Sequence, residues 1–435
     1  MEHIVIIGNG IAGVTAARHI RKQSDKKISI ISAETQYFFS RTALMYVYMG
    51  HMRWKDIEPY ESWFWQKNRI ELVHGFVEKV DPKMKTLHFS DGKSMTYDKL
   101  ILATGSRTNT FGWEGQDLPQ VLGLVNRQDL EKLEKVAPDK NKCPRAVIVG
   151  GGLIGVELAE MLRTRDIEVT FLVREDAFWT NVLPRADAQM ISRHISSHGV
   201  DLRHETQLDK ILPDAKGDVR AVRTTTGEEI PCSMVGITTG VVPNIGFLKG
   251  SGIETDKGIL VNRRLETSAP EVYAIGDCAQ QRKPIGNRPP VEAVWYTGRI
   301  MGEVVARTLC GKQMEYRPSN WFNSAKFFDI EYQTYGWVFS ERRRKDYEEH
   351  FHWVHRDDDK CITLAYHRES GKFLGINTFG IRMKHEVFEN WLNEEKSVDY
   401  VIHNLDKANF DPEFYTSYHK ELLNTYRNQI KRTVS

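Results

Sequence analysis

Three glycines near the N-terminus have the types and the spacing of a phosphate-binding turn. Gly8, Gly10 and Gly13 form a G-x-G-x-x-G pattern directly after the apolar residues 4–7, which predict a buried strand. In such a turn the first glycine permits the bend, the second lets the backbone approach a pyrophosphate, and the third lets helix and strand pack closely. A helix predicted over residues 14–22 would direct its N-terminal N–H groups at the phosphates. The pattern predicts a dinucleotide site.

An acidic residue follows at the distance that such a site requires. Residues 28–31 predict a second strand, and Glu34 lies just beyond it, roughly 20 residues after the glycine turn. A carboxylate there can bond a ribose diol. The alternative is an ordinary surface acid, and the position at a strand end favours the ligand interpretation.

The same pattern returns later in the chain. Residues 146–149 predict a strand, Gly150, Gly152 and Gly155 follow, and Glu157 lies in the first turn of the next helix. One such unit arises easily by chance, whereas two of them about 140 residues apart indicate two dinucleotide sites.

The strand predicted over residues 169–173 ends in Arg174 and Glu175. A carboxylate at this position bonds the 2′-hydroxyl of NAD, and an arginine accommodates the 2′-phosphate of NADP. Because both signs stand side by side, the residues leave the choice of nicotinamide cofactor open.

Two further turns place backbone where a cofactor can approach. Residues 97–102 predict a buried strand that runs into Ala103, Thr104 and Gly105. Gly276 and Asp277 follow another predicted strand, and an aspartate there can bond a polyol hydroxyl; a plain surface turn is the alternative. A helix is predicted over residues 291–309.

Composition limits the class of protein. A chain of 435 residues is long enough for two or three domains, and its formal net charge of +2 favours neither nucleic acid nor an anionic membrane as partner. We expect no signal peptide and no membrane span, because no charged leader and no run of about 18 apolar residues is present. The five dispersed cysteines predict buried thiols in a reducing cytoplasm, and we predict no metal site.

The last part of the chain changes character. Strands are predicted over residues 327–338, 361–366 and 373–379, and charge runs at 342–345 and 357–359 predict solvated hairpin ends. Helical spacing runs from 385 to 405. Residues 411–412 interrupt it before a last helix, predicted over 415–430.

Together these blocks resemble the two-dinucleotide-binding flavoprotein superfamily, the pyridine nucleotide–disulfide oxidoreductases. Rubredoxin reductases, the flavin half of assimilatory nitrite reductases and apoptosis-inducing-factor-like ferredoxin reductases are the most similar members. The resemblance implies an α/β fold with two Rossmann-like domains and a C-terminal α+β interface domain with a helical extension. Its implied boundaries are 1–115 with 245–315 for FAD, 116–244 for NAD(P), 316–382 for the interface domain and 383–435 for the extension.

The resemblance also implies which residues hold the cofactors. The FAD residues are Gly8, Gly10, Ile11, Ala12, Gly13, Glu34, Arg41, Val77, Ala103, Thr104, Gly105, Gly276 and Asp277. The NAD(P)H residues are Gly150, Gly152, Leu153, Ile154, Gly155, Arg174 and Glu175. Glu157 is the one charged side chain that the resemblance puts near the nicotinamide, with orientation as its implied role; helix-dipole complementarity is the alternative.

Two departures from the superfamily matter. Its disulfide-reducing members carry redox cysteines after the first Rossmann unit, where this chain has residues 40–46, and no cysteine precedes Cys143. The ferredoxin-reductase-like members usually have a lysine where Tyr46 stands. Arg174 matches the phosphate-binding arginine of NADP-using members, but Thr180 replaces their second arginine and Val173 replaces the glutamate of NAD-using members.

The resulting prediction is a cytoplasmic flavoenzyme, a monomer or homodimer, that takes hydride from a nicotinamide onto FAD. No acid, base or nucleophile is needed for that transfer. Without a cysteine relay, electrons would pass directly to an acceptor: an iron–sulfur or rubredoxin-type protein, a small quinone or a metal complex. The alternative is a flavin-binding, redox-gated interaction protein with slow or no turnover; a membrane-associated quinone reductase ranks last because the tail lacks a long apolar or basic amphipathic face.

Overall fold

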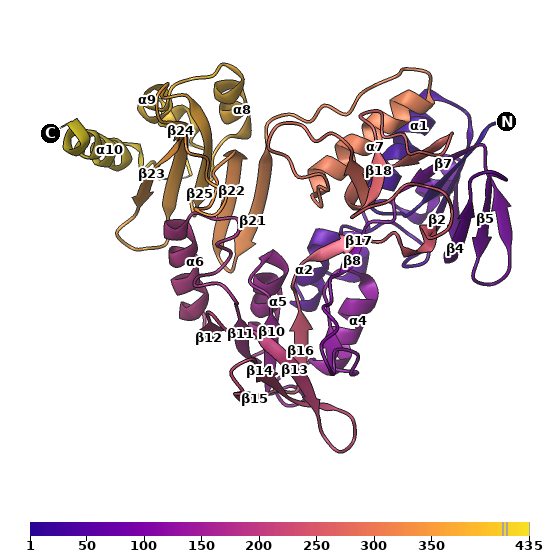
Figure 1. The fold of residues 1–435 in the computed structure, drawn as a ribbon, viewed down its shortest axis with the longest axis horizontal. Helices are drawn as coiled ribbons and strands as arrows, with labels where there is room; N and C mark the ends of the chain where they lie inside the picture. The colour runs from indigo at the N-terminus through magenta and orange to yellow at the C-terminus, as the bar shows by residue number, and fades with distance from the viewer. Residues whose placement is uncertain (411–412, 415, 435) are drawn as a thin grey trace. The chain divides into compact units, whose positions relative to one another are not determined.

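The computed structural model describes residues 1–410, 413–414 and 416–434, with side chains described up to residue 429. The chain forms two compact units. Unit 1 comprises residues 1–111, 122–138 and 239–318, and unit 2 comprises residues 112–121, 139–238 and 319–435. Elements of both units are labelled in Figure 1.

Unit 1 is built on a five-stranded sheet with the order β19-β7-β1-β2-β3, in which all neighbours are parallel. The central strand β1 (His3–Ile7) pairs Ile4 with Ile28 of β2 and with Lys99 of β7. Its apolar residues are buried on both faces, as expected of a parallel strand covered by helices. The remaining strands of this sheet are β2 (Lys27–Ser32), β3 (Ile70–His74), β7 (Lys99–Leu102) and β19 (Val272–Ala274).

Two long helices of unit 1 pack side by side, as Figure 1 shows for α1 (Ile11–Gln23) and α7 (Trp295–Leu309). Gly302 of α7 makes this contact possible, because a Cβ at this position would lie 2.5 Å from the carbonyl oxygen of Ala12. The predicted start of α7 at residue 291 is four residues too early, since Val291 instead forms a β-bridge with Gln280.

Smaller elements complete unit 1. A three-stranded meander and two strand pairs accompany short helices: β4 (Val77–Asp81), β5 (Thr86–Phe89), β6 (Ser94–Thr96), β8 (Ser106–Thr108) with β17 (Val241–Pro243), β18 (Ile259–Val261) with β20 (Ala279–Gln281), α2 (Leu44–Tyr48), α3 (Ser62–Lys67), α4 (Arg127–Val136), and the 3-10 helices η1 (Arg41–Ala43), η2 (Trp54–Ile57), η3 (Gly246–Leu248) and η4 (Gly276–Cys278).

Unit 2 contains a second five-stranded sheet, with the order β12-β11-β10-β16-β9. Strand β10 (Arg145–Val149) pairs in parallel with β11 (Glu168–Leu172) and β16 (Met234–Ile237). The other elements of this part are α5 (Leu153–Arg163), α6 (Arg185–Ser197), β9 (Val121–Leu122), β12 (Val200–Arg203), β13 (Leu208–Pro213), β14 (Val219–Thr224) and β15 (Glu229–Pro231). This arrangement confirms the predicted α/β class with two Rossmann-like sheets.

The C-terminal part of unit 2 is an antiparallel sheet with the order β21-β22-β25-β24-β23. Its elements are β21 (Phe322–Phe327), β22 (Ile330–Gly336), β23 (Glu348–Val354), β24 (Cys361–His367), β25 (Phe373–Phe379), α8 (His385–Asn393), α9 (Val398–His403), η5 (Leu405–Ala408) and α10 (His419–Val434). Aromatic and aliphatic side chains of the sheet and of these helices form one core.

Two local predictions differ from this structure. The strand predicted over 327–338 corresponds to β22, which begins only at Ile330 because residues 328–329 form the turn of a hairpin with β21. Strand β23 was not predicted. The helical stretch 385–405 is interrupted because Glu395 adopts a positive φ of 52° and Ser397 then caps α9 by accepting from the N–H of Tyr400. The predicted break at Asp411-Pro412 and the predicted helix start at Tyr415 lie outside the described residues.

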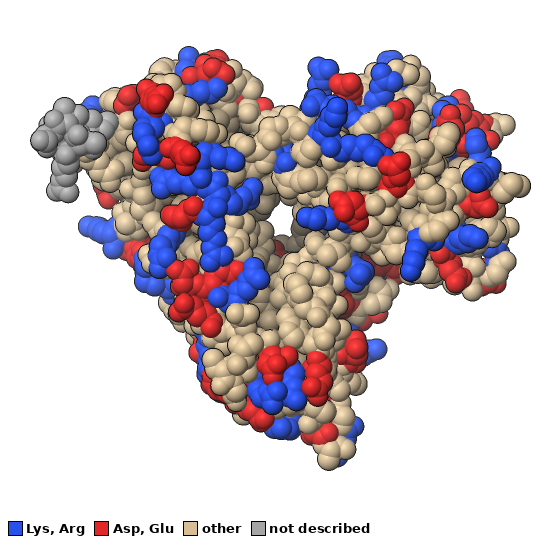
Figure 2. Space-filling view, viewed as in Figure 1, with Lys and Arg blue, Asp and Glu red and all other residues tan. Residues whose placement is uncertain are grey.

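Lysine and arginine side chains are interspersed with aspartates and glutamates on the face shown in Figure 2. Among the described residues, no helix is both long enough and apolar enough to cross a membrane. The cysteines are unpaired; four are buried and Cys310 is partly exposed.

Candidate functional site

The first glycine turn of unit 1 depends on glycine at its two outer positions. Gly8 has a φ of +115°, and a Cβ there would lie 2.1 Å from the carbonyl oxygen of Ala103. A Cβ at Gly13 would lie 2.1 Å from the carbonyl oxygen of Gly8. Both contacts are far inside van der Waals distance, so strand β1, strand β7 and helix α1 can approach as they do only because these side chains are absent.

Gly10 is different, because no described atom lies within 4 Å of the position that its Cβ would occupy. It precedes helix α1 in extended conformation, with φ −72° and ψ −177°. Val14 is the first residue of α1 whose N–H bonds back to Gly10. The N–H groups of Ile11, Ala12 and Gly13 therefore precede the helical hydrogen-bond ladder. The open space therefore lies beside a set of backbone donors at the positive end of a helix, which suits a phosphate.

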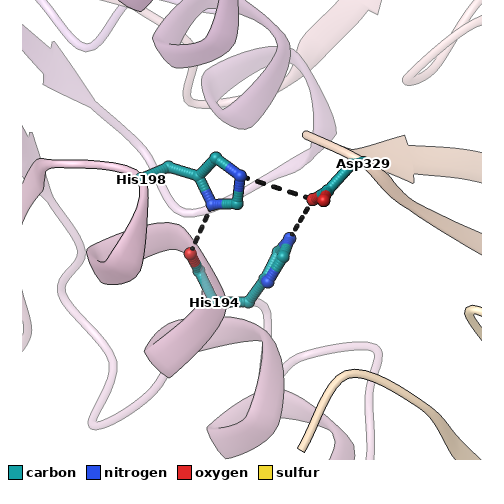
Figure 3. A group of neighbouring side chains, drawn as sticks. All are labelled: His194, His198 and Asp329. Atoms are coloured by element: carbon teal, nitrogen blue, oxygen red, sulfur yellow. Dashed lines mark hydrogen bonds and ion pairs between the residues drawn. The ribbon is translucent and has the colours of Figure 1, made fainter. Parts of the chain in front are cut away.

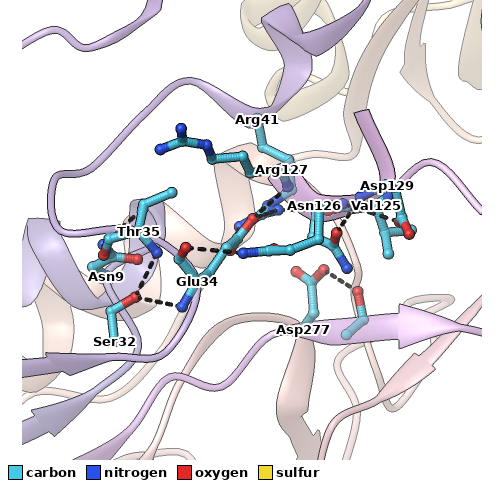
Figure 4. A network of polar contacts seen from close by, with 12 residues as sticks. Asn9, Ser32, Glu34, Thr35, Arg41, Val125, Asn126, Arg127, Asp129 and Asp277 are labelled. Carbon is cyan, nitrogen blue, oxygen red and sulfur yellow. Dashed lines mark hydrogen bonds and ion pairs between the residues drawn. The ribbon is translucent and has the colours of Figure 1, made fainter. Parts of the chain in front are cut away.

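Glu34 takes part in a dense polar network, shown in Figure 4. Its carboxylate accepts two hydrogen bonds from the guanidinium of Arg41, at 2.9 and 2.6 Å, and one from the backbone N–H of Arg127 at 2.9 Å. Arg41 also donates to the carbonyl oxygen of Val125. The structure thus brings Glu34 and Arg41 together as a pair, with α4 supplying the third partner.

Asp277 lies below Asn126 in this view, in η4. Burial raises the pKa of its carboxyl group, and the Ser106 hydroxyl, which donates to it at 3.1 Å, and the charge of Arg41 oppose that rise. A carboxylate has room for about four hydrogen bonds, so a partly dehydrated one with this single side-chain donor can accept further hydroxyl groups.

The other predicted residues of unit 1 lie either in turns or in the hydrophobic core. Thr104 donates from its hydroxyl to the carbonyl oxygen of Asn244 at 2.8 Å, and Gly105 has a φ of +65°. Gly276, with a φ of +73°, approaches Ala12, because a Cβ there would lie 3.0 Å from that of Ala12. Val77, in β4, is buried in the hydrophobic core.

The second glycine turn, in unit 2, repeats the first. Gly150 has a φ of +116°, and a Cβ at Gly155 would lie 2.6 Å from the carbonyl oxygen of Gly150. Gly152 is extended, precedes α5, and has no described atom within 4 Å of its virtual Cβ. Leu153 and Ile154 form the first turn of α5, so their N–H groups lie beside the open space at Gly152, and unit 2 has its own set of backbone donors.

The two charges at the end of β11 are unequally accessible. Glu175 is 7% exposed, and its Oε1 atom accepts from Arg174 Nε and from Asn181 Nδ2, each at 2.8 Å. The side chain of Arg174 is 66% exposed. The structure therefore presents a cation at this strand end and holds the carboxylate inward.

Glu157 lies in α5 close to a second acidic residue. Burial and the nearby charge of Glu160 raise its pKa to about 7. Glu160 itself is buried and accepts from Lys326 Nζ at 2.6 Å. The structure therefore neutralises Glu160 with a lysine and disfavours a charge on Glu157.

Several neighbours of the predicted residues were not predicted. Arg127 reaches Glu34 from 93 positions away, and the carbonyl oxygen of Val125 accepts from Arg41. Asn9, which donates to Thr35 O at 2.8 Å, lies inside the glycine motif as one of its variable positions. Asn181 follows β11 in a loop with no pattern of its own. Of these, only the position of Asn9 within the motif was a usable signal.

A separate surface pocket of about 390 Å³ lies between α4 and the segments containing Val47 and Trp54. Its lining includes Arg127 and Leu130 but none of the residues predicted to bind a cofactor. The glycine turns, with their open backbone donors, remain the better candidate site.

Two parallel sheets, each with a glycine turn at the start of a helix, define a dinucleotide-binding protein of the Rossmann type. A family model described as pyridine nucleotide-disulphide oxidoreductase matches residues 2–301, and the chain belongs to this family. Membership confirms the predicted resemblance, the use of FAD and NAD(P)H, and the enzyme class, an NAD(P)H-dependent FAD oxidoreductase.

The relatives agree with this class. The chain is 32% identical to a ferredoxin–NAD(P)+ reductase of a Sphingomonas species over 77% of its own length and 80% of that protein's. It is 27% identical to the rubredoxin–NAD+ reductase of Ectopseudomonas oleovorans, over 71% and 80%. A solved structure of an NAD-dependent persulfide reductase from A. fulgidus has the same fold, with a TM-score of 0.86, 22% identity, and 99% of this chain and 84% of that chain covered.

Proposed function

We propose that this chain delivers electrons from NADPH to an external redox protein without a cysteine relay. FAD would be held in unit 1 by the Gly8-to-Gly13 turn, Glu34 with Arg41, the 103–105 turn and Asp277, and NADPH in unit 2 by the Gly150-to-Gly155 turn and Arg174. The open space beside Gly10 and the under-bonded Asp277 carboxylate fit a pyrophosphate and a polyol chain. The flavin, when bound, supplies the hydride and electron chemistry.

The absence of a relay rests on one observation, the segment that follows the first Rossmann unit. Residues 41–48 form η1 and α2 without a cysteine. The cysteine adjacent to Asp277, Cys278, is fully buried, its Sγ donates to the carbonyl oxygen of Ile275, and burial raises the pKa of its thiol. A reactive thiol must ionise and be reached, so Cys278 is unsuited to carry electrons.

A redox protein is the acceptor that the relatives favour, since their names are ferredoxin and rubredoxin reductases. A small quinone is the alternative electron acceptor for the same enzyme. The donor is inferred from the accessible charge at the end of β11, because an exposed arginine with the neighbouring carboxylate held inward attracts a 2′-phosphate.

The first experiment mixes the flavin-loaded protein anaerobically with NADPH or NADH and follows the loss of flavin absorbance. We expect faster bleaching by NADPH, and Arg174→Ala to weaken NADPH at least tenfold more than NADH, because it removes the charge that faces the phosphate. Arg220→Ala is the control, since Arg220 is also exposed and paired with a glutamate in unit 2. An equal effect of Arg174→Ala on both nucleotides would refute the donor assignment.

The second experiment supplies reduced protein with a ferredoxin, a rubredoxin or a soluble quinone. Variants Cys278→Ala and Cys310→Ala should retain acceptor reduction, because neither thiol carries electrons. Loss of turnover with intact flavin bleaching would instead assign a relay to that cysteine. Slow bleaching by both nucleotides would favour the interaction protein over the enzyme.

A further inference from the structure

His194 in the last turn of helix α6, the C-cap residue His198 and an aspartate from a hairpin turn converge in unit 2, as Figure 3 shows. His194 and His198 are four positions apart, so they lie on one face at the C-terminal end of the helix. Asp329 belongs to the turn between β21 and β22, where Phe328 adopts a positive φ of 55°. The ligand atoms of the three side chains all lie within 4.8 Å of one another.

The spacing of these atoms is close to that of a metal's ligand sphere. Asp329 Oδ1 lies 2.7 Å from His194 Nε2 and 3.3 Å from His198 Nε2. With metal–ligand bonds of about 2.0–2.1 Å, neighbouring ligand atoms of a tetrahedral Zn²⁺ are roughly 3.3 Å apart. The Asp329 side chain is 74% exposed, so it can retreat by the few tenths of an ångström that His194 requires.

The orientation of His198 is fixed by a second contact. Its Nδ1 atom lies 2.9 Å from the carbonyl oxygen of His194 and must donate to it, because a carbonyl only accepts. The ring also stacks on Phe328, with centroids 4.4 Å apart. A ligating histidine characteristically donates its other ring nitrogen to a backbone carbonyl in this way.

This hydrogen bond has a consequence at the other ring nitrogen. In neutral His198 the Nε2 atom carries a lone pair, and it faces a carboxylate oxygen, so two acceptors are opposed. A metal ion placed between the three side chains would accept both of these lone pairs.

We propose that His194 Nε2, His198 Nε2 and the Asp329 carboxylate bind a divalent first-row transition metal, with Zn²⁺ as the representative ion. Two imidazoles and one carboxylate suit such ions, and the exposure of Asp329 leaves the remaining coordination position to water. The ion would join α6 to the β21–β22 turn, two segments that are 135 residues apart. No metal site was predicted from the sequence.

The test titrates Zn²⁺ alone, and separately Co²⁺, into protein first treated with a chelator and then freed of it. We expect one Zn²⁺ per chain by calorimetry, visible d–d absorption from Co²⁺, and a rise in the unfolding temperature with added Zn²⁺. His198→Ala and Asp329→Asn should each weaken Zn²⁺ binding at least tenfold. Asp329 is exposed, so its substitution leaves the fold intact, which far-ultraviolet circular dichroism checks.

His403→Ala is the matched control, because His403 is exposed and also contacts a helix carbonyl four positions earlier through Nδ1, at 2.7 Å from Asp399 O. It should bind Zn²⁺ as the unchanged protein does. Absence of binding at 0.1 mM Zn²⁺, or undiminished binding in the His194→Ala, His198→Ala double variant, would overturn the proposal in favour of a protonated histidine–aspartate pair. Binding lost instead in Asp357→Asn, in the hairpin turn near His355, would assign the ion to that neighbouring group.

Discussion

Glu157 is a residue whose charge the fold disfavours. Its pKa in the folded protein is about 7, above the ordinary 4.5, because of burial and the charge of Glu160. Between these two values the folded protein holds a proton that the unfolded chain has released. The free energy of unfolding therefore falls as the pH rises from about 4.5 to about 7.

We predict that Glu157→Gln removes this dependence. At pH 8 the variant should be more stable than the unchanged protein by roughly 2 kcal/mol, and at pH 5 the two should be nearly equal. Urea unfolding at both pH values measures the difference. Glu168→Gln, an exposed position beside Arg145, is the control and should leave the pH dependence intact. A pH-independent difference would mean that Glu157 is ionised throughout this range.

At the scale of the element, each glycine turn combines two unlike requirements. Gly13 is needed for packing, because a Cβ there would collide with backbone, whereas Gly10 has space beside it. The fold alone therefore does not require glycine at position 10, and a bound phosphate does.

This difference predicts contrasting outcomes for two substitutions in one turn. Gly10→Val should fold with an unfolding temperature near that of the unchanged protein but lose FAD, because its side chain enters the phosphate space. Gly13→Val should lower the free energy of unfolding by several kcal/mol, since α1 must move away from β1. Flavin content after purification and thermal unfolding of the flavin-free proteins separate the two effects. A yellow, fully loaded Gly10→Val protein would contradict the FAD assignment.

At the scale of the whole molecule, a buried carboxylate joins the two sheets of unit 2. Asp187 of α6 is fully buried and accepts from the Thr363 hydroxyl at 2.6 Å and from Asn377 Nδ2 at 3.0 Å, and His352 Nδ1 lies 3.3 Å away. The helix belongs to the parallel sheet and its partners belong to the antiparallel one. These contacts join the two layers, together with the aromatic contacts of Phe178 and Trp179 with Phe327.

We predict that Asp187→Ala lowers the free energy of unfolding by roughly 3 kcal/mol, because it leaves buried polar partners without an acceptor. Chemical denaturation of the full chain measures the loss. Asp209→Ala, at an exposed pair with Arg223, should cost under about 1 kcal/mol. Equal losses in the two variants would show that the buried network contributes no more than a surface pair.

The conformation of the two glycine turns was predictable because it is local. A strand, a bend and a helix start are specified by neighbouring residues, so the pattern at residues 4–13 and its repeat near residue 150 indicated both Rossmann units and their backbone donors. The hairpin turn of β21 and β22 and the strand β23 were not predicted, although β23 alternates buried Phe351 and Trp353 with His350 and His352 as a half-buried strand does.

The sequence by itself determined the fold class, the two dinucleotide turns and the absence of cysteines from the segment after the first of them. Only the tertiary structure decided which of Arg174 and Glu175 is exposed, which partners surround Glu34, and that Asp329 meets the two histidines of α6. The physical reason is distance along the chain. Burial and pairing depend on residues tens to hundreds of positions away, and no local pattern records which of them the packed elements bring into contact.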